Sequence, residues 1–174
     1  MGFPFREGVE YVYANNFLDR RVGEALPYNL VRGMRRDGTL QRAHDGVDIY
    51  VDFGTPVVSP FRGRLIDPAS RWIPWVKERY GMTAVIVSNE PASRGYVALL
   101  AHMEELRVRP GDRVKRGQVI GRIGDSGNAE GGRVHLHIEL RAPFRMLVRF
   151  GGISRAVDVF DPYPSLYHAD PNHR

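Results

Sequence analysis

Two histidines stand one residue apart in the run "RVHLHIEL", residues 133–140. Side chains of a β-strand alternate between its two faces, so His135, His137 and Glu139 should point the same way, with the aliphatic residues between them packed behind. Two imidazoles on one face can surround a small site, which suits metal binding or proton transfer. A strand with two half-exposed histidines would show the same spacing.

A second run, "AHDGVDI", places His44 and Asp48 four residues apart. The chain has no cysteine, so a bound metal would need His, Asp or Glu ligands. His44, Asp48 and one histidine of the HLH strand would supply three ligands and leave a fourth position open, as in catalytic zinc sites. The remaining strand histidine would then be available for proton transfer.

A further histidine, His102, ends the apolar run "GYVALLAHM". Strand parity places it on the same face as Ala98 and Leu100. Taken alone, it is better explained as a strand-end histidine with ordinary surface hydrogen bonds.

The segments that would position these residues read mostly as strands. Short runs rich in Val and Ile, such as "GVDIYV", "MTAVIVSN" and "QVIGRIG", are separated by Gly, Pro, Asn or Asp. Only "WIPWVKERYG" and "MEELRV" suggest a helical turn or two. We therefore predict a mostly β fold with little helix.

The patterning divides the chain into three parts. Residues 1–43 lack sustained alternation and are predicted to be an N-terminal arm, part of which we expect to lie across the groove and slow substrate entry. Residues 44–142 hold the strand patterns and form the predicted core. The proline-rich remainder, residues 143–174, is expected to pack on the outside of that core.

Composition limits the classes of protein that fit. The 174 residues suit one globular domain, and 43% hydrophobic with 26% charged residues is ordinary for such a domain. The net charge of +5 favours acidic partners such as nucleic acid, anionic lipid or a cell-wall polymer, but no nucleic-acid motif is present. No transmembrane run or export signal is recognisable in the given sequence, so a cytoplasmic location stays open.

The motifs, taken in order, resemble a known family. H-x-x-x-D, a strand-terminal "AH", the run "VRPGDRVKRGQVIGRIGDSG" and then "HLHIEL" are similar to the M23 zinc metallopeptidases, the lysostaphin and LytM-type peptidoglycan endopeptidases. The resemblance covers about residues 42–142. It implies an antiparallel, two-sheet core of the duplicated-hybrid-motif (barrel-sandwich-like) kind, with the metal in a groove across one sheet.

The resemblance also implies a role for each candidate residue. His44, Asp48 and His137 correspond to the ligands of one Zn²⁺ per chain, and His135 and His102 to two catalytic histidines that do not bind the metal. The implied activity is hydrolysis of peptide bonds in peptidoglycan by a metal-activated water. One histidine would move its proton, and the other would stabilise the oxyanion if it is protonated or donates a hydrogen bond.

Such enzymes act on the cell wall, so the resemblance implies a periplasmic or extracellular location. Two alternatives stay open. A catalytically silent relative would bind wall material or activate another hydrolase. A hybrid-barrel carrier or phosphotransfer module would use a hairpin-tip lysine such as Lys115, but would not need the histidine motifs.

This chain departs from the family pattern at two places. Arg133 and Val134 stand where family members often have Gly and Pro. The connection "DPASRWIPWVKERYGMTAV" is longer and more aromatic than usual, so Trp72, Trp75 and Tyr80 are predicted to form a groove wall, with core packing as the alternative. Glu139 is a candidate to orient an imidazole through its other nitrogen, with an exposed strand position as the alternative. The sequence does not specify the bond that is cleaved.

Overall fold

The structure is a computed structural model that describes residues 1–17, 20–22, 41–70, 79–150 and 153–173. Its strands are β1 (Tyr11–Tyr13), β2 (Arg20–Val22), β3 (Gln41–Ala43), β4 (Val47–Val51), β5 (Pro56–Val58), β6 (Gly63–Leu65), β7 (Met82–Ser88), β8 (Val97–Leu106), β9 (Arg113–Val114), β10 (Val119–Ile123), β11 (His135–Phe150) and β12 (Ile153–Phe160). Its helical elements are η1 (Pro68–Ser70), η2 (Pro91–Ser93), η3 (Gly127–Ala129), α2 (Tyr163–Ala169) and η4 (Pro171–His173). The prediction of a mostly β fold with little helix is confirmed.

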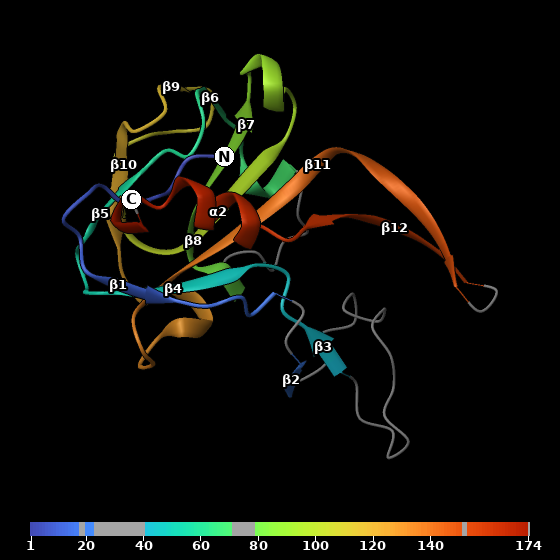
Figure 1. Cartoon of the computed structure of the whole chain (residues 1–174), viewed down its shortest axis with the longest axis horizontal. Helices are drawn as coiled ribbons and strands as arrows, with labels where there is room; N and C mark the ends of the chain where they lie inside the picture. The colour runs from blue at the N-terminus through green and yellow to red at the C-terminus, as the bar shows by residue number, and fades with distance from the viewer. Residues whose placement is uncertain (18–19, 23–40, 71–78, 151–152, 174) are drawn as a thin grey trace.

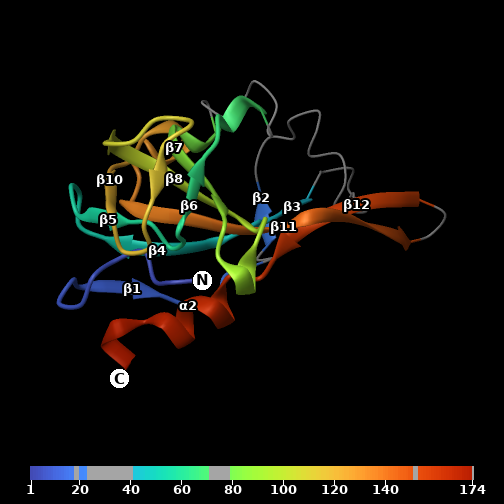
Figure 2. The same ribbon diagram turned by 90° about the horizontal axis from the view of Figure 1, so that it is seen from above.

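Ten strands form one antiparallel sheet with the order β1-β4-β11-β8-β7-β6-β9. Away from this path, β10 pairs with both β5 and β8, and β12 pairs with β11. A separate two-stranded sheet joins β2 to β3. Figures 1 and 2 show β11 and β12 running together beyond the rest of the sheet, and the paired part of β11 between β4 and β8.

The centre of the sheet follows the predicted alternation. In β4, Val47 and Ile49 are fully buried, and in β11 so are Leu136 and Ile138. These four side chains belong to one hydrophobic cluster, and burying each contributes about 1.5–3 kcal/mol. Their packing fixes the register that pairs β4 with β11, and so brings the residues between them to the opposite face.

Gly46 allows the chain to approach β11 closely just before β4. A Cβ atom at this position would lie 2.3 Å from the carbonyl oxygen of Ile138 and 2.9 Å from Cε1 of His137. A larger residue would therefore push the two segments apart. Only glycine fits at position 46 of the "AHDGVDI" run, because the backbone there lies directly against the HLH strand.

The first 17 residues are part of the packed core. Phe3 and Phe5 are buried in its main cluster, and β1 pairs with β4. The hydroxyls of Tyr11 and Tyr13 both donate to the carboxylate of Asp170, which follows α2, and Figure 2 shows α2 beside β1. The predicted passage of the arm across the groove concerns the rest of residues 1–43, most of which lie outside the described residues, and stays a prediction.

Two local expectations are corrected by the structure. The run "MEELRV" is not helical through Leu106, because β8 continues to that residue and buries Met103 completely. The C-terminal segment contains α2, which was not among the predicted helical turns. Pro162 is its N-cap and Pro164 lies in its first turn, where a missing N–H costs no helical hydrogen bond. The other helical candidate, "WIPWVKERYG", lies mostly outside the described residues.

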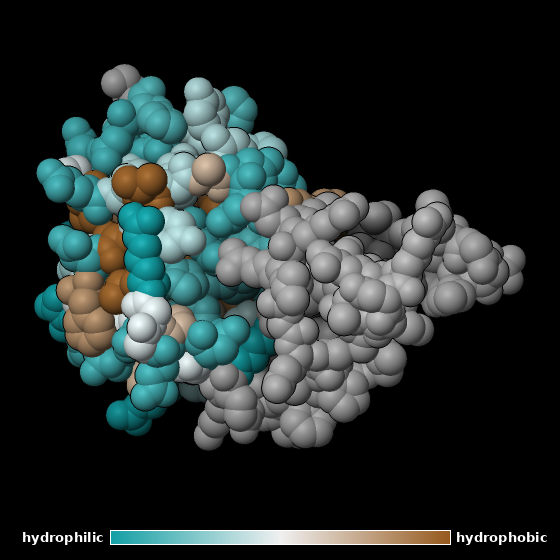
Figure 3. Space-filling model, turned by 90° about the horizontal axis from the view of Figure 1, so that it is seen from below, coloured by the Kyte–Doolittle hydropathy of each residue, from teal (hydrophilic) through white to brown (hydrophobic). Residues whose placement is uncertain are grey.

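On the face seen in Figure 3, the coloured residues are mostly hydrophilic, and apolar residues gather among them in patches. Among the residues whose side chains the structure describes, the most exposed large apolar ones are Val12, with 64% of its surface accessible, and Phe53, with 56%. Within the described part of the chain, no helix has the length and apolar character needed to cross a membrane.

Candidate metal centre

Three side chains converge where β4 and β11 pair. Asp48 and His137 are directly opposite each other in the antiparallel register, and His44 lies just before β4. The Nε2 atom of His44 is 3.0 Å from Oδ1 of Asp48, and the Nδ1 atom of His137 is 2.9 Å from the same oxygen. The two nitrogens are themselves 2.9 Å apart. All three side chains are buried, and one donor atom from each lies within 4.8 Å of the others.

The other nitrogen of each imidazole points outward to an oxygen. Nδ1 of His44 lies 2.9 Å from the carbonyl oxygen of Asn16, which can only accept, so this nitrogen carries the proton. Nε2 of His137 lies 3.1 Å from Oε1 of Glu139. That carboxylate also accepts from the hydroxyl of Tyr80 at 2.6 Å and from Nε of Arg141 at 2.8 Å. An ionised Glu139 therefore accepts a hydrogen bond from Nε2–H of His137.

This proton arrangement tests whether the site suits a metal ion. With both protons held outward, the inward nitrogens of His44 and His137 present lone pairs to each other and to the Asp48 carboxylate. Three electron-rich atoms this close repel one another unless a cation lies among them. Two neutral imidazoles and a carboxylate are also ligands that Zn²⁺ accepts where no thiolate is present. The residues present therefore fit a bound divalent cation.

The charges around the site agree with this interpretation. Burial disfavours ionisation of Asp48, but the His137 and His44 rings, which donate hydrogen bonds to it when their inward nitrogens are protonated, outweigh burial and hold the pKa of the carboxyl well below its usual range. Burial also opposes a charge on His137, yet Asp48 and Glu139 raise the pKa of this imidazole. Arg141 and His137 hold the pKa of Glu139 low against its complete burial. The electrostatic environment thus favours positive charge between the two carboxylates.

His135 and His102 lie beside the same cluster. Their ring centroids are 4.8 Å apart, and Nε2 of His135 lies 3.9 Å from Oδ1 of Asp48. Each Nδ1–H donates to a backbone carbonyl: His135 to Arg133 at 2.7 Å and His102 to Ser126 at 2.8 Å. In their neutral forms, both rings therefore carry a lone pair on Nε2. Burial, with the His137 and His135 rings, lowers the pKa of His102 to about 4.

His102 reaches this cluster through an irregular backbone. Its φ of 62° lies in the left-handed region, where no other described non-glycine residue is found. The register against β7 has one extra β8 residue between Leu100 and Met103, and the register against β10 has one between Met103 and Glu105, which is the pattern of bulges. The predicted parity with Leu100 is therefore wrong, because that residue faces the core while the His102 ring packs against His135.

The structure brings together all five histidine and aspartate candidates, and it buries Glu139 completely beside His137. Tyr80 is also buried, with its ring centroid 5.6 Å from that of His137, so it lies under the site and is not part of an exposed wall. The predicted wall residues Trp72 and Trp75 lie outside the described residues.

Sequence reasoning missed three contributors to the site. Arg141 shares strand parity with His137 and Glu139, so its pairing with Glu139 could have been found from the HLH strand. The carbonyl groups of Asn16 and Ser126 hold His44 and His102, but backbone acceptors leave no signal in residue type. Only the folded path of the chain brings these carbonyls to the site.

Comparison with known proteins agrees with this geometry. The model of Peptidase family M23 matches residues 42–148. Glycyl-glycine endopeptidase ALE-1 of Staphylococcus capitis is 31% identical over 96 residues, which are 55% of this chain and 24% of that protein. The chain spans about a quarter of the length of the curated relatives it matches.

Solved structures show the same fold. The catalytic domain of the antimicrobial peptidase lysostaphin from Staphylococcus simulans aligns with a TM-score of 0.57 at 23% identity, over 91% of this chain and 92% of that domain. A zinc-containing peptidase from Vibrio cholerae aligns with a TM-score of 0.55 at 23% identity, over 90% of this chain and 37% of that one. With the family model covering more than half of its length, the chain belongs to peptidase family M23.

Proposed function

We propose that this peptidase is a zinc-dependent endopeptidase that hydrolyses peptide bonds in peptidoglycan. The observation that carries the proposal is the convergence of His44, Asp48 and His137, with the imidazole protons directed away from the shared centre. A curated relative that is named a glycyl-glycine endopeptidase supports a peptide substrate. Membership of the family supports hydrolysis as the reaction.

The three ligand side chains would hold one Zn²⁺ per chain. When bound, the ion would lower the pKa of a water molecule and polarise the carbonyl of the scissile bond. The protein keeps the ligands ready for this: Asn16 and Glu139 fix the tautomers of His44 and His137. Such outer hydrogen bonds orient metal ligands and raise their basicity.

His135 and His102 would move the protons. Because both rings donate Nδ1–H to backbone carbonyls, each has Nε2 available as an acceptor. His135 is the more exposed of the two and would take a proton from the attacking water and pass it to the leaving amine. His102 can donate to an oxyanion only after it has gained a proton on Nε2. The edge-to-face contact between the two rings would keep both imidazoles in place while the protons move.

The proposed substrate places the protein at the cell wall, in the periplasm or outside the cell. A catalytically silent relative is less well supported, because all three predicted ligand positions are occupied by suitable residues that meet in space. A carrier module is also less well supported: Lys115 is exposed, but nothing in that role would need the buried histidine cluster.

Two measurements test the proposal. Purified protein should contain one zinc per chain, and His44→Ala, Asp48→Ala and His137→Ala should each lose it. Incubation with purified peptidoglycan should produce new amino termini, identified by mass spectrometry, with the wild type but not with these variants. His168→Ala, which removes an exposed histidine on α2, is the matched control. Full zinc occupancy in all three ligand variants would contradict the assignment.

A further inference from the structure

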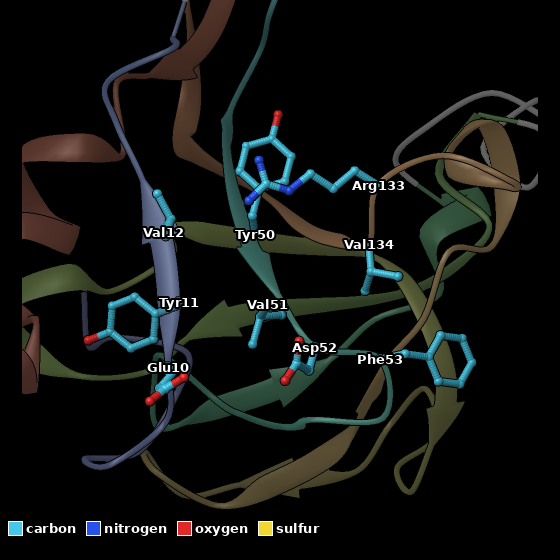
Figure 4. A pocket seen from close by; sticks show the side chains of 9 residues that line it. All are labelled: Glu10, Tyr11, Val12, Tyr50, Val51, Asp52, Phe53, Arg133 and Val134. Atoms are coloured by element: carbon cyan, nitrogen blue, oxygen red, sulfur yellow. The ribbon is translucent and has the colours of Figure 1, made fainter.

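A pocket of about 390 Å³ lies on the same face of the sheet as the metal centre, over β1 and the end of β4. Figure 4 shows its lining, with Tyr50 and Arg133 at one end and Glu10 and Asp52 at the other. None of these residues is a predicted metal ligand or catalytic histidine. The volume is within the range of about 300–1,000 Å³ that is usual for ligand sites.

Strand register connects this pocket to the reaction centre. Tyr50 is directly opposite His135 on β11 and Val12 on β1, so these three side chains form one row across neighbouring strands. The adjacent row, two residues along each strand, is Asp48 with His137. Two residues of a strand span about 6.5–7 Å. A group bound in the pocket would therefore lie about two extended residues from the scissile bond.

Three of the side chains in this region form a continuous stack that leads away from His135. The ring of Tyr50 lies 5.7 Å from the imidazole of His135, and the guanidinium carbon of Arg133 lies 4.2 Å from the centre of the Tyr50 ring. Arg133 contributes in a second way, because its backbone carbonyl accepts the Nδ1–H of His135. The same residue thus sets the tautomer of one proposed catalytic histidine and lines the adjoining pocket.

The guanidinium of Arg133 is fixed in orientation, but its donors have no acceptor in the described part of the protein. Among the residues that the structure describes, its only side-chain partner is the face of Tyr50. Stacking holds the guanidinium plane while leaving the N–H groups at its edge available, and their fork matches the two oxygens of a carboxylate. Glu10 and Asp52, which are exposed, would repel an anion from the far end. An anion is therefore best placed at the end nearest His135.

We propose that this pocket is a substrate subsite, and that Arg133, held on Tyr50, binds a carboxylate of the wall peptide about two residues from the cleaved bond. The inference rests on the proposed function, and it adds the chemical class of substrate group that is recognised next to the reaction centre. Val12 supplies an exposed apolar wall for the neighbouring part of the peptide.

Chemically modified peptidoglycan tests this subsite whichever peptide bond of the wall is cleaved. One half of a purified preparation is treated with carbodiimide and ammonia, which converts its carboxylates to amides, and the other half is left untreated. The release of new amino termini and the fraction of protein that sediments with the polymer are measured on both. The wild type should be about tenfold slower on the amidated polymer, as expected for loss of one charge-assisted hydrogen-bonded pair.

Arg133→Gln should be about tenfold slower than the wild type on untreated polymer and should no longer distinguish the two preparations. Tyr50→Phe, which keeps the ring, should retain the preference for carboxylate, whereas Tyr50→Leu should lose most of it. Arg94→Gln removes the same charge from an exposed residue beside η2 that does not line the pocket, and should behave like the wild type.

The outcomes separate this inference from the proposed function. Cleavage by the wild type with an undiminished preference for carboxylate in Arg133→Gln would overturn the subsite alone. An equal loss in Arg94→Gln would attribute the effect to overall charge and would also overturn it. If the wild type released no amino termini from either polymer, the proposed function would fail, and the sedimented fraction would still show whether Arg133 recognises carboxylate.

Discussion

Asp48 and Asp170 are both buried carboxylates, with 1% and 2% of their surfaces exposed, but their partners differ in kind. Asp170 accepts hydrogen bonds from the hydroxyls of Tyr11 and Tyr13 and from the backbone N–H of Asn172. Each of these groups brings its own proton. Asp48 instead faces nitrogens of His44 and His137 whose protons are held elsewhere.

The difference shows what separates a structural carboxylate from a candidate ligand. Burial and close polar contacts are common to both, and both carboxyl groups have a lowered pKa. Only the position of the protons differs: the Asp170 cluster is complete with its own hydrogens, whereas the Asp48 cluster needs a cation. Five experiments can break or sharpen this contrast, beginning with the one for which the largest effect is expected.

Asn substitution at each carboxylate should give opposite results for metal content. Asp48→Asn replaces an anionic ligand by a neutral amide and should abolish both stoichiometric zinc and peptidase activity. Asp170→Asn should retain full zinc and lose only stability. Elemental analysis of the two purified variants measures the difference. Equal zinc content in the two variants would mean that the position of the neighbouring protons does not separate a metal-binding carboxylate from a structural one.

His135→Ala should keep its zinc and lose about 10²- to 10⁴-fold in the rate of the chemical step, the range for removal of a general acid or base. His137→Ala should lose the metal itself, and with it the stability that binding provides. Zinc content and cleavage rate are measured side by side for each variant. A His135→Ala protein without metal, next to a His137→Ala protein that retains it, would reverse the two roles.

Glu139→Gln tests the outward proton of His137. Removing the carboxylate charge weakens the hydrogen bond that keeps the proton on Nε2, so zinc affinity should fall about 10- to 100-fold. Competition with a chelator of known affinity measures the change. Glu130→Gln removes an exposed acid and should leave the affinity as in the wild type. A Glu139→Gln protein that matches this control would show that the contact does not tune the metal.

Acid should weaken the Asp170 cluster in a defined pH range. Burial raises the pKa of Asp170, but hydrogen bonds from Tyr11, Asn172 and Tyr13 outweigh burial and lower it below the unfolded value of about 3.9. The resulting stability is present above about pH 4 and is lost as the pH falls through the folded pKa.

Urea unfolding of the wild type and of Asp170→Asn from pH 7 to pH 2 measures this loss. The variant should be less stable at pH 7 by about 1–3 kcal/mol, and the difference should shrink in acid. His173, whose Nδ1 lies 3.4 Å from the carboxylate, also contacts this cluster, so His173→Asn is the control background. A difference that stays constant with pH would exclude this cause.

The smallest expected effect concerns the backbone of His102. A side chain in the left-handed region costs about 1–2 kcal/mol relative to glycine, so His102→Gly should be more stable than His102→Ala by about 1 kcal/mol. At the neighbouring Ala101, glycine should instead destabilise, because this residue has an ordinary φ. Thermal unfolding of the three variants gives the comparison. A His102→Gly protein no more stable than His102→Ala would argue against the bulge.

The part of the site that depends on regular geometry was predictable from the sequence. Parity in the HLH strand put His135 and His137 on one face, and the pairing with β4 is the regular antiparallel arrangement that such parity assumes. His102 was placed on the wrong face because a bulge reverses parity without any change in the surrounding apolar pattern. Parity is a local rule, and an inserted residue cancels it.

The fold was predictable to a similar degree. Alternating Val and Ile runs predicted the strands, but "MEELRV" has residues that suit either state, and its pairing with β10 decides for strand. Phe3 and Phe5 lie in a segment without periodicity, so nothing local showed that they complete the core. Long-range contacts of this kind are not encoded in a short window of sequence.

The contact between Asp48 and His137 joins residues 89 positions apart, and it exists only where β4 has paired with β11. Closing so long a loop is slow, and strand pairings between distant segments form late relative to local structure. No metal-binding triad can therefore assemble in an early folding intermediate that lacks this pairing. In a refolding experiment with a chromogenic metal such as Co²⁺, we expect the ligand-field absorbance to appear with the final cooperative phase, which would make the ion a reporter of completed folding.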